Sequence, residues 1–293
     1  MKKLLLIINP NAGTRQARRF LPEILSAFRR GGYLCTVCVT EKQGDAVGLA
    51  RANAGDADLV VACGGDGTLN EVITGLQFGG HRTALGYIPC GSTNDFASAI
   101  GLKKTIPAAT DAILNGTPHT YDVGLFGERP FSYVASCGVF SRASYATPQN
   151  AKNAVGYLAY VMEGIKDLAT IHPHHLSIEV DGKKIEGDYL LAAVSNSTSL
   201  GGVLKLKKDM VDMNDGMLEL LLVGMPRTAA DWNESLLALA EQRYDTPNLI
   251  LLSGREFHVT APADMEWSLD GEWCGGAENI TIRNGPDAIC LIH

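Results

Sequence analysis

The chain has 293 residues, of which 46% are hydrophobic and 19% charged, and its formal net charge is −7. This length exceeds the size at which one hydrophobic core usually stops growing, so two domains are expected. The longest apolar runs reach about five residues, whereas a membrane-spanning helix needs roughly 18 to 20. The composition therefore excludes a bundle of membrane spans, and the net acidity argues against nucleic acid as a partner.

Charge is distributed unevenly along the chain. Residues 1–120 carry 12 Lys and Arg against 9 Asp and Glu, whereas residues 121–293 carry 13 against 23. The densest basic cluster holds Arg15, Arg18 and Arg19, with Arg29 and Arg30. Two interpretations of it stay open: a helix face exposed to solvent, or a surface that meets anionic lipid or nucleotide phosphate.

The first 120 residues alternate strand and helix patterns. The expected elements are a strand at Leu4–Ile8, a helix that ends at Gly31-Gly32, a strand at 33–40, a helix at 44–54, a strand at Asp58–Cys63, a helix from Leu69 and a strand at Leu85–Ile88. Repeated β-α-β units predict a doubly wound parallel sheet covered by helices. The first strand is too short for the apolar core of a signal peptide, and seven scattered cysteines form no disulfide framework, so a cytoplasmic protein is expected.

After Tyr121 short alternating runs follow one another, separated by Gly, Asp and Asn. They are Phe131–Ser136, His175–Val180, Ile185–Val194, Met217–Val223, Glu256–Thr260, Asn279–Ile282 and Ala288–Ile292, with helical stretches at Ala151–Leu168 and Thr228–Arg243. With the hairpin signal Asp181-Gly182, this pattern predicts an antiparallel β-sandwich. We expect an α/β domain at 1–125 and a β-sandwich domain at 126–285, and the last strand, near 286–293, is a candidate to return to the first domain.

The segment Val60–Glu71 carries the strongest chemical signal. A buried strand runs into Gly64-Gly65-Asp66-Gly67-Thr68, and a helix follows. Glycines let a backbone approach a ligand closely, and the start of a helix offers unpaired N–H groups to an anion, so phosphate is the expected ligand. The segment matches neither the Walker A loop nor the dinucleotide-binding fingerprint. The alternative is a tight turn between a strand and a helix that binds nothing.

Two further polar loops follow strands of the same domain. Residues 9–13 read Asn-Pro-Asn-Ala-Gly, and residues 89–95 read Pro-Cys-Gly-Ser-Thr-Asn-Asp. In a parallel sheet, loops that follow strands emerge at the carboxyl ends of those strands, which is the edge where open α/β folds bind ligands. Three such loops at one edge strengthen the prediction of a phosphate site.

The combination N-P-x-x-G, G-G-D-G-T-L-N-E and P-x-G-[ST]-x-N-D resembles the catalytic domain of the diacylglycerol kinase family, especially its soluble bacterial lipid kinases. The segment Ser268–Glu272 is similar to the D-G-E motif of that family. The resemblance implies a nucleotide-binding domain like that of NAD kinase and phosphofructokinase, followed by a β-sandwich domain. It further implies an ATP- and Mg²⁺-dependent kinase that phosphorylates the hydroxyl of a membrane lipid, most simply diacylglycerol to phosphatidic acid.

The resemblance also assigns roles to individual residues. Those that would hold the nucleotide are Asn9, Pro10, Gly13, Thr40, Gly64, Gly65, Asp66, Gly67, Thr68, Asn70, Glu71, Gly91, Ser92, Thr93, Asn94 and Asp95. Asp66 would organise phosphate and Mg²⁺, while Asp270 and Glu272 would lie near the acceptor hydroxyl. The family points to Glu272 as the proton acceptor, although Asp270 is almost as plausible chemically. The alternative is that Asp270-Gly271 is merely a hairpin turn.

A structural Mg²⁺ site is implied in the acidic stretch that follows Lys208. Its ligands would be the carboxylates of Asp212 and Asp215 and the carbonyl of Met217, because hard cations accept oxygen ligands. Asn214 stands where the family has the first of two paired aspartates, so a solvated acidic turn is the alternative.

Two rival functions and the partners complete the expectations. An NAD kinase shares G-G-D-G-T but would lack the P-x-G-[ST]-x-N-D loop, and a nucleotide- or lipid-binding protein without catalysis would not need every carboxylate retained. The expected partner is a membrane lipid met by transient, peripheral contact at the inner face of the membrane. The oligomeric state stays open, with a homodimer as one arrangement.

Overall fold

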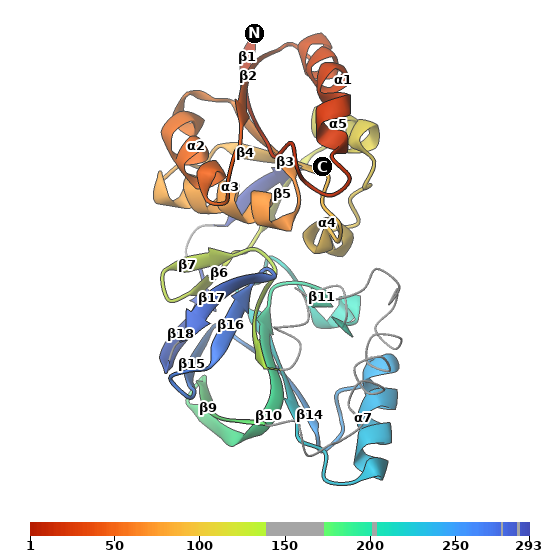
Figure 1. Cartoon of the computed structure of the whole chain (residues 1–293), viewed down its shortest axis with the longest axis vertical. Coiled ribbons are helices and arrows are strands. Elements are labelled where there is room, and N and C mark those ends of the chain that lie inside the picture. Colours follow the sequence, from red (N-terminus) through yellow and green to blue (C-terminus); the bar gives the residue numbers. More distant parts are fainter. Residues whose placement is uncertain (139–172, 201–203, 277, 286–287) are drawn as a thin grey trace. The chain divides into compact units, whose positions relative to one another are not determined.

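The computed structural model describes residues 1–138, 173–200, 204–276, 278–285 and 288–293. The chain divides into two compact units (Figure 1): unit 1 comprises Met1–Val123 and Pro286–His293, and unit 2 comprises Gly124–Gly285. None of the helices in the described ranges is long and apolar enough to cross a membrane.

Unit 1 is built on a six-stranded sheet with the order β2-β1-β3-β4-β19-β5. Its strands are β1 (Lys2–Ile8), β2 (Tyr33–Val39), β3 (Leu59–Gly64), β4 (Ala84–Pro89), β5 (Pro118–Tyr121) and β19 (Ile289–Ile292). The pairs are parallel except for that of β5 with β19. From β1 the chain adds β2 on one side and β3 on the other, so the carboxyl ends of β1 and β3 form the topological switch point at which such sheets bind ligands.

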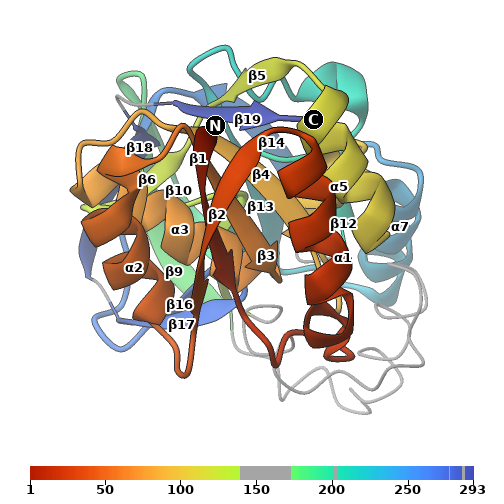
Figure 2. The same cartoon turned by 90° about the horizontal axis from the view of Figure 1, so that it is seen from above.

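Helices cover both faces of this sheet. They are α1 (Gln16–Arg30), α2 (Asp45–Asn53), α3 (Asp66–Phe78), α4 (Asp95–Ala99) and α5 (Ile106–Asn115), with a 3₁₀ turn, η1, at Ala54–Asp56. Helices α1 and α5 pack side by side on one face, and α2 and α3 pack on the other, as Figures 1 and 2 show from two directions. Strands β1 and β3 are apolar along almost their whole length because both of their faces are buried.

Unit 2 contains an eleven-stranded sheet with the order β17-β16-β8-β10-β9-β15-β18-β6-β7, to which β13 is joined through β10 and β14 through β13. Its strands are β6 (Gly124–Phe126), β7 (Arg129–Phe131), β8 (Val134–Gly138), β9 (His174–Val180), β10 (Lys183–Ser195), β13 (Leu218–Gly224), β14 (Leu249–Gly254), β15 (Glu256–Thr260), β16 (Glu266–Leu269), β17 (Glu272–Gly276) and β18 (Asn279–Asn284). Smaller elements are β11 (Ser199–Leu200), β12 (Leu204–Lys205), η4 (Lys208–Met210) and α7 (Ala229–Ala240).

The long strand β10 turns this single ladder into two layers. Its first part, up to Tyr189, pairs with β9, and its second part, from Leu191, pairs with β8 and β13. One core cluster combines side chains of both parts, such as Ile178 of β9, Leu220 of β13 and Trp267 of β16. The two halves of the sheet therefore pack face to face as a sandwich.

A second core lies on the other face of the layer that contains β13. Leu191 and Leu221 pack there with Ala238 and Leu239 of α7. The second part of β10 and most of β13 are thus buried on both faces, which explains why residues 190–194 read as an unbroken apolar run. Thr228 and the side chain of Asp231 form a capping box that begins α7.

Several elements differ from the sequence-based expectations. Helix α3 begins at Asp66 rather than Leu69, so the acidic residue lies in its first turn. The run Phe131–Ser136 is divided between β7 and β8, because the backbone N–H groups at 132–134 bind a carboxylate instead of continuing a ladder. The patterns did not predict β5, β6, β11, β12, β14, β16 and β17. The helix expected at Ala151–Leu168 lies outside the described residues.

Candidate active site

The loops that follow β1 and β3 are joined in unit 1 by the side chain of Asn9. Its Nδ2 atom donates to Oγ1 of Thr68 on α3 at 3.4 Å, and its backbone N–H donates to the carbonyl of Cys63 at 2.9 Å. Its Oδ1 atom accepts from the N–H of Asn11 at 2.9 Å, which shapes its own loop. Asn9 thus fixes the first loop against the beginning of α3.

The buried carboxylate of Asp66 joins the second loop to the third. Its Oδ2 accepts from the N–H of Asp95 at 3.0 Å, and its Oδ1 accepts from the N–H of Phe96 at 3.3 Å. These are the first two residues of α4, whose N–H groups have no partner within the helix, and a negative charge there is favoured by the helix dipole. Asp66 therefore caps α4 and locks the loop at 89–95 against the loop at 64–68.

Three backbone segments touch at glycines. A Cβ atom on Gly91 would lie 2.6 Å from Cα of Gly65, and a Cβ atom on Gly13 would lie 2.3 Å from the carbonyl oxygen of Cys90. Gly13 also has a φ of +52°, a conformation that side chains disfavour. Only glycine lets the three loops approach this closely.

Asn94 folds the third loop from within. It adopts a left-handed conformation with φ of 52°, its Oδ1 accepts from the N–H of Gly91 at 2.9 Å and from the hydroxyl of Tyr87 at 3.3 Å, and its Nδ2 donates to the Gly91 carbonyl at 2.9 Å. Burial, followed by the charge of Asp66, raises the pKa of Tyr87 well above its usual value. The phenol therefore stays protonated and keeps its role as a donor.

Two further predicted ligands organise the neighbouring β2–α2 connection. The carboxylate of Glu71 accepts from the N–H of Gly44 at 2.8 Å and from that of Ala46 at 3.1 Å, at the start of α2. Thr40 is buried at the end of β2, where its N–H donates to the carbonyl of Ile8 at 3.0 Å. Glu71 thus holds the start of α2 in place, and Thr40 holds the end of β2 against the end of β1.

The remaining groups at this edge are suited to an anion. Gly13, Ser92 and Thr93 are exposed, whereas Pro10 is buried and the others, Gly67 and Asn70, are half-buried. The N-cap of helix α3 is Gly65, which has no side chain to cap the first N–H groups of the helix. Hydroxyl donors beside a helix N-terminus form an arrangement that binds phosphate.

In unit 2 the Asp-Gly-Glu segment forms the turn between β16 and β17. Asp270 and Gly271 both have positive φ, 50° and 84°, as a two-residue hairpin turn requires. The Asp270 carboxylate accepts hydrogen bonds from the N–H and hydroxyl of Ser132 at 2.6 and 2.7 Å, from the N–H of Tyr133 at 2.9 Å and from that of Val134 at 3.0 Å. Burial raises the pKa of Asp270, and these hydrogen bonds oppose the rise. Its oxygens are thus engaged in holding the β7–β8 turn.

Glu272 lies two residues after Asp270 and, unlike the buried Asp270, is exposed. It begins β17 and pairs with Leu269 across the hairpin. The next residue, Trp273, is 62% exposed, although a tryptophan is usually mostly buried. Trp273 is not among the predicted site residues, and its position directly after the D-G-E motif is the sequence signal that marks it.

The acidic stretch 212–219 brings three carboxylates near one another. Asp212 and Asp215 are exposed and accept from the N–H groups of Asn214 and Met217 at 3.0 and 2.9 Å. Glu219 is 2% exposed, and its Oε2 atom has no hydrogen-bond partner among the described residues. Burial, together with the charges of Asp215 and Asp212, raises the pKa of Glu219 to about 8.

Such a cluster fits a hard cation, which accepts carboxylate, carbonyl and water oxygens and relieves the repulsion between the acids. Within the described ranges, however, no three His, Cys, Asp or Glu side chains are grouped closely enough to bind a metal by themselves. The site would therefore need the Met217 carbonyl and water as further ligands. The contribution of Glu219 was not foreseen, because nothing in the local pattern marks a buried strand glutamate.

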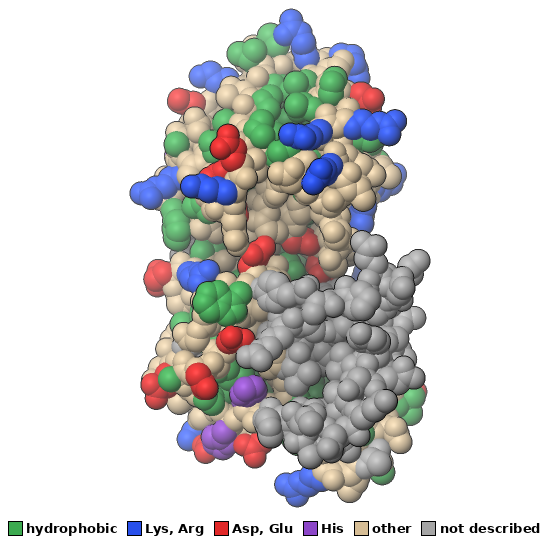
Figure 3. Space-filling model, viewed as in Figure 1, with side chains coloured by type: hydrophobic (Ala, Val, Ile, Leu, Met, Phe, Trp, Pro, Cys, Tyr) green, Lys and Arg blue, Asp and Glu red, His purple; other side chains and the backbone are tan. Residues whose placement is uncertain are grey.

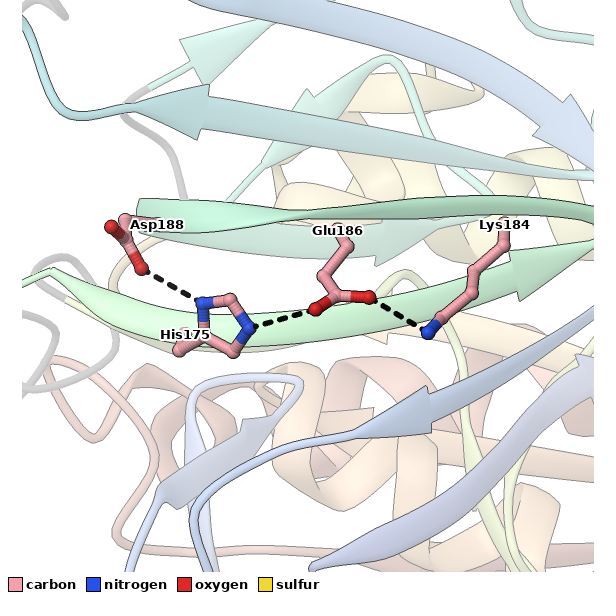
Figure 4. Close-up of polar contacts among 4 residues, drawn as sticks. All are labelled: His175, Lys184, Glu186 and Asp188. Carbon is pink, nitrogen blue, oxygen red and sulfur yellow. Dashed lines mark hydrogen bonds and ion pairs between the residues drawn. The ribbon is translucent and has the colours of Figure 1, made fainter.

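A second polar cluster lies on the exposed face of β9 and β10 (Figure 4). The imidazole of His175 is held between Asp188 at 2.9 Å and Glu186 at 3.3 Å, and Glu186 also pairs with Lys184 at 2.7 Å. These two carboxylates raise the pKa of His175. All four side chains are exposed, so the cluster is a surface network of the sheet.

The profile of the diacylglycerol kinase catalytic domain matches residues 3–126, and that of the YegS C-terminal NAD kinase beta sandwich-like domain matches residues 133–293. A diacylglycerol kinase of Bacillus subtilis strain 168 is 34% identical over 277 residues, which cover 94% of this chain and 91% of that protein. A diacylglycerol kinase of Staphylococcus aureus strain bovine RF122 / ET3-1 is 34% identical over 275 residues, or 94% and 87%.

The fold agrees with a crystal structure of a diacylglycerol kinase from Bacillus anthracis str. Sterne, with a TM-score of 0.77, 22% identity, and coverage of 100% of this chain and 97% of that one. The two domain profiles and these relatives define a kinase that phosphorylates an alcohol group. The chain belongs to the diacylglycerol kinase family and is a lipid kinase.

Proposed function

We propose that this lipid kinase transfers the γ-phosphoryl group of ATP to the free hydroxyl of diacylglycerol and thereby forms phosphatidic acid. The observation that carries the use of ATP is the junction of three phosphate-type loops, locked by Asn9 and Asp66, at the carboxyl ends of β1, β3 and β4. Two relatives named diacylglycerol kinase, each 34% identical, support the acceptor.

The two units divide the chemistry between them. In unit 1 the N-terminus of α3 and the hydroxyls of Ser92 and Thr93 bind the nucleotide phosphates, and Asp66 keeps these groups in position through α4. In unit 2 Glu272 accepts the proton of the lipid hydroxyl, since an alcohol is a poor nucleophile until a base takes its proton. Asp270 positions the hairpin that carries Glu272 and does not exchange the proton itself.

Magnesium has two places in this proposal. When it is bound with the nucleotide, Mg²⁺ would neutralise part of the negative charge of the phosphates. A separate structural Mg²⁺ would be held by Asp212, Asp215 and the Met217 carbonyl, with Glu219 behind them.

The function is tested by incubating the purified protein with labelled ATP, Mg²⁺ and mixed micelles that contain diacylglycerol, and by identifying the product by mass spectrometry. We expect phosphatidic acid and ADP. In the variant Asp66→Ala, kcat/KM for ATP should fall by about tenfold or more, because loss of a helix cap costs up to about 2 kcal/mol and misplaces the third loop.

The matched control is Asp56→Asn, which changes an exposed acid of unit 1 away from the loops and should leave kcat/KM unchanged. Circular dichroism verifies that both variants are folded. A parallel reaction contains NAD in place of the lipid, and formation of labelled NAD phosphate there would overturn the assignment of a lipid as acceptor. Full activity of Asp66→Ala would overturn the site assignment.

We further propose that the amino-terminal end of α1 meets the membrane. Arg15, Arg18 and Arg19 are all exposed, and Lys and Arg side chains (blue in Figure 3) stand out on the face of unit 1 that this view presents. Each basic residue near an anionic surface contributes about 1 kcal/mol, so changing all three to Glu should weaken binding to phosphatidylglycerol vesicles at least tenfold at low salt.

Vesicle sedimentation measures this effect. The control changes three exposed lysines of unit 2, Lys183, Lys207 and Lys208, to Glu, which gives the same change in net charge. If both triple variants bind equally well, the contact is not made by α1.

A further inference from the structure

Two thiols lie against each other directly beneath the nucleotide loops. Cys63 lies at the end of β3, immediately before Gly64, and Cys90 follows β4, immediately before Gly91. Their Sγ atoms are 3.6 Å apart. Both side chains belong to the core between the sheet and the helices α1 and α5, and they are 0% and 9% exposed.

We propose that Cys63 and Cys90 form a reversible dithiol–disulfide site, which a hydroperoxide oxidises and a thiol reductant restores, and that the disulfide form binds the nucleotide poorly. The site of oxidation is independent of the proposed function. The effect on the nucleotide rests on the proposal that the loops bind ATP.

The order of the chemical steps follows from the surroundings of the two sulfurs. Cys90 is the more exposed, and its hydrogen bond with Cys63 lowers the pKa of Cys90 and raises that of Cys63 well above its usual value. The Cys90 thiolate attacks one oxygen of hydrogen peroxide, the O–O bond breaks, and a sulfenic acid and one water form after proton uptake. The Cys63 sulfur then attacks the Cys90 sulfur, and the hydroxyl leaves with the Cys63 proton as a second water. The two electrons lost by the sulfurs reduce the peroxide.

The geometry couples this bond to the loops. A disulfide needs a sulfur separation of about 2.05 Å, so the two atoms must approach by about 1.5 Å. Cys90 has little room to move, because its N–H is bonded to the Gly64 carbonyl at 2.7 Å and its carbonyl oxygen lies against Gly13. The adjoining Gly91 lies against Gly65. Movement of Cys90 therefore displaces all three loops from the arrangement that Asn9 and Asp66 maintain.

Another pair of cysteines serves as the internal control. Cys35 and Cys38 lie on β2, three residues apart, where strand alternation directs their side chains to opposite faces of the sheet. They are half-buried and so accessible to an oxidant, but they cannot pair in this strand. A peroxide effect that belongs to the contact between Cys63 and Cys90 should be absent from this second pair.

The test treats the full-length protein with hydrogen peroxide, blocks the remaining thiols with an alkylating agent and digests it without reduction. We expect one cross-linked peptide pair, joining Cys63 to Cys90 with the loss of two hydrogens, and its disappearance after dithiothreitol. Calorimetry should show at least a tenfold loss of ATP affinity after oxidation and recovery on reduction. Absence of this cross-link, or a cross-link through other cysteines, overturns the site.

Variants separate the steps. Cys90→Ala and Cys63→Ser should each abolish the cross-link. Because each removes a different thiol, the prediction can still be tested if one of the two variants fails to fold. Cys35→Ala/Cys38→Ala should keep both the cross-link and the loss of affinity. A cross-link that leaves ATP affinity unchanged overturns the coupling to the loops. If the reduced protein binds no ATP, the proposed function is contradicted. The presence or absence of the cross-link still tests the dithiol–disulfide site by itself.

Discussion

Replacing Glu272 by Gln is expected to lower kcat for lipid phosphorylation by about 10²- to 10⁴-fold, the usual contribution of a positioned general base. The amide has the same shape but does not take up a proton at neutral pH. The side chain is exposed at the start of β17, so the unfolding temperature and the affinity for ATP should stay close to those of the wild type. Steady-state kinetics with diacylglycerol micelles measures kcat, thermal denaturation measures the unfolding temperature, and calorimetric titration measures the affinity for ATP.

Glu272 is chosen over Asp270 because of the contacts that the Asp270 carboxylate makes. Four hydrogen bonds from Ser132–Val134 fill the acceptor positions of the Asp270 carboxylate, which leaves it badly placed to take a proton from a substrate. Glu278→Gln is a suitable control, because Glu278 is an exposed acid of the same unit outside the hairpin. If Glu272→Gln turned over lipid at the wild-type rate, another group would have to be the base.

Replacing Asp270 by Asn is expected to lower the free energy of unfolding by about 3–5 kcal/mol. The amide keeps one oxygen and replaces the other by an NH₂ group, which leaves two of the four donors buried without an acceptor, at a cost of about 1–3 kcal/mol for each. Asn has nearly the same size and tolerates the left-handed backbone, so strain contributes little. Urea denaturation of the two proteins measures the difference.

The control for this stability prediction is Asp264→Asn. Asp264 is exposed in the turn before β16, and its replacement should change the free energy of unfolding by less than about 0.5 kcal/mol. Equal losses in Asp264→Asn and Asp270→Asn would show that the buried hydrogen bonds do not stabilise unit 2. A fully stable Asp270→Asn that had lost activity would instead return Asp270 to consideration as the base.

The fold class could be predicted because both sheets leave direct marks on the sequence. A strand covered on two faces must be apolar throughout, as β1 and β3 are, and a strand covered on one face alternates, as β15 does. The hairpin between β9 and β10 was likewise readable, since Asp181 and Gly182 both adopt positive φ. Strands such as β5 were missed because its residues, Pro118–Tyr121, are mostly exposed and carry no pattern.

The sequence by itself therefore determined the alternation of elements, the parallel and antiparallel classes of the two sheets, and the presence of three loops of the phosphate-binding type. These depend on local preferences that each segment carries alone. Only the tertiary structure decided which groups those loops and turns bind: Asp66 with α4, Asp270 with a turn 136 to 138 residues away, Cys63 with Cys90, and Glu219 behind the acidic stretch. Such pairs depend on strand register and burial, and both are set only when distant segments pack together.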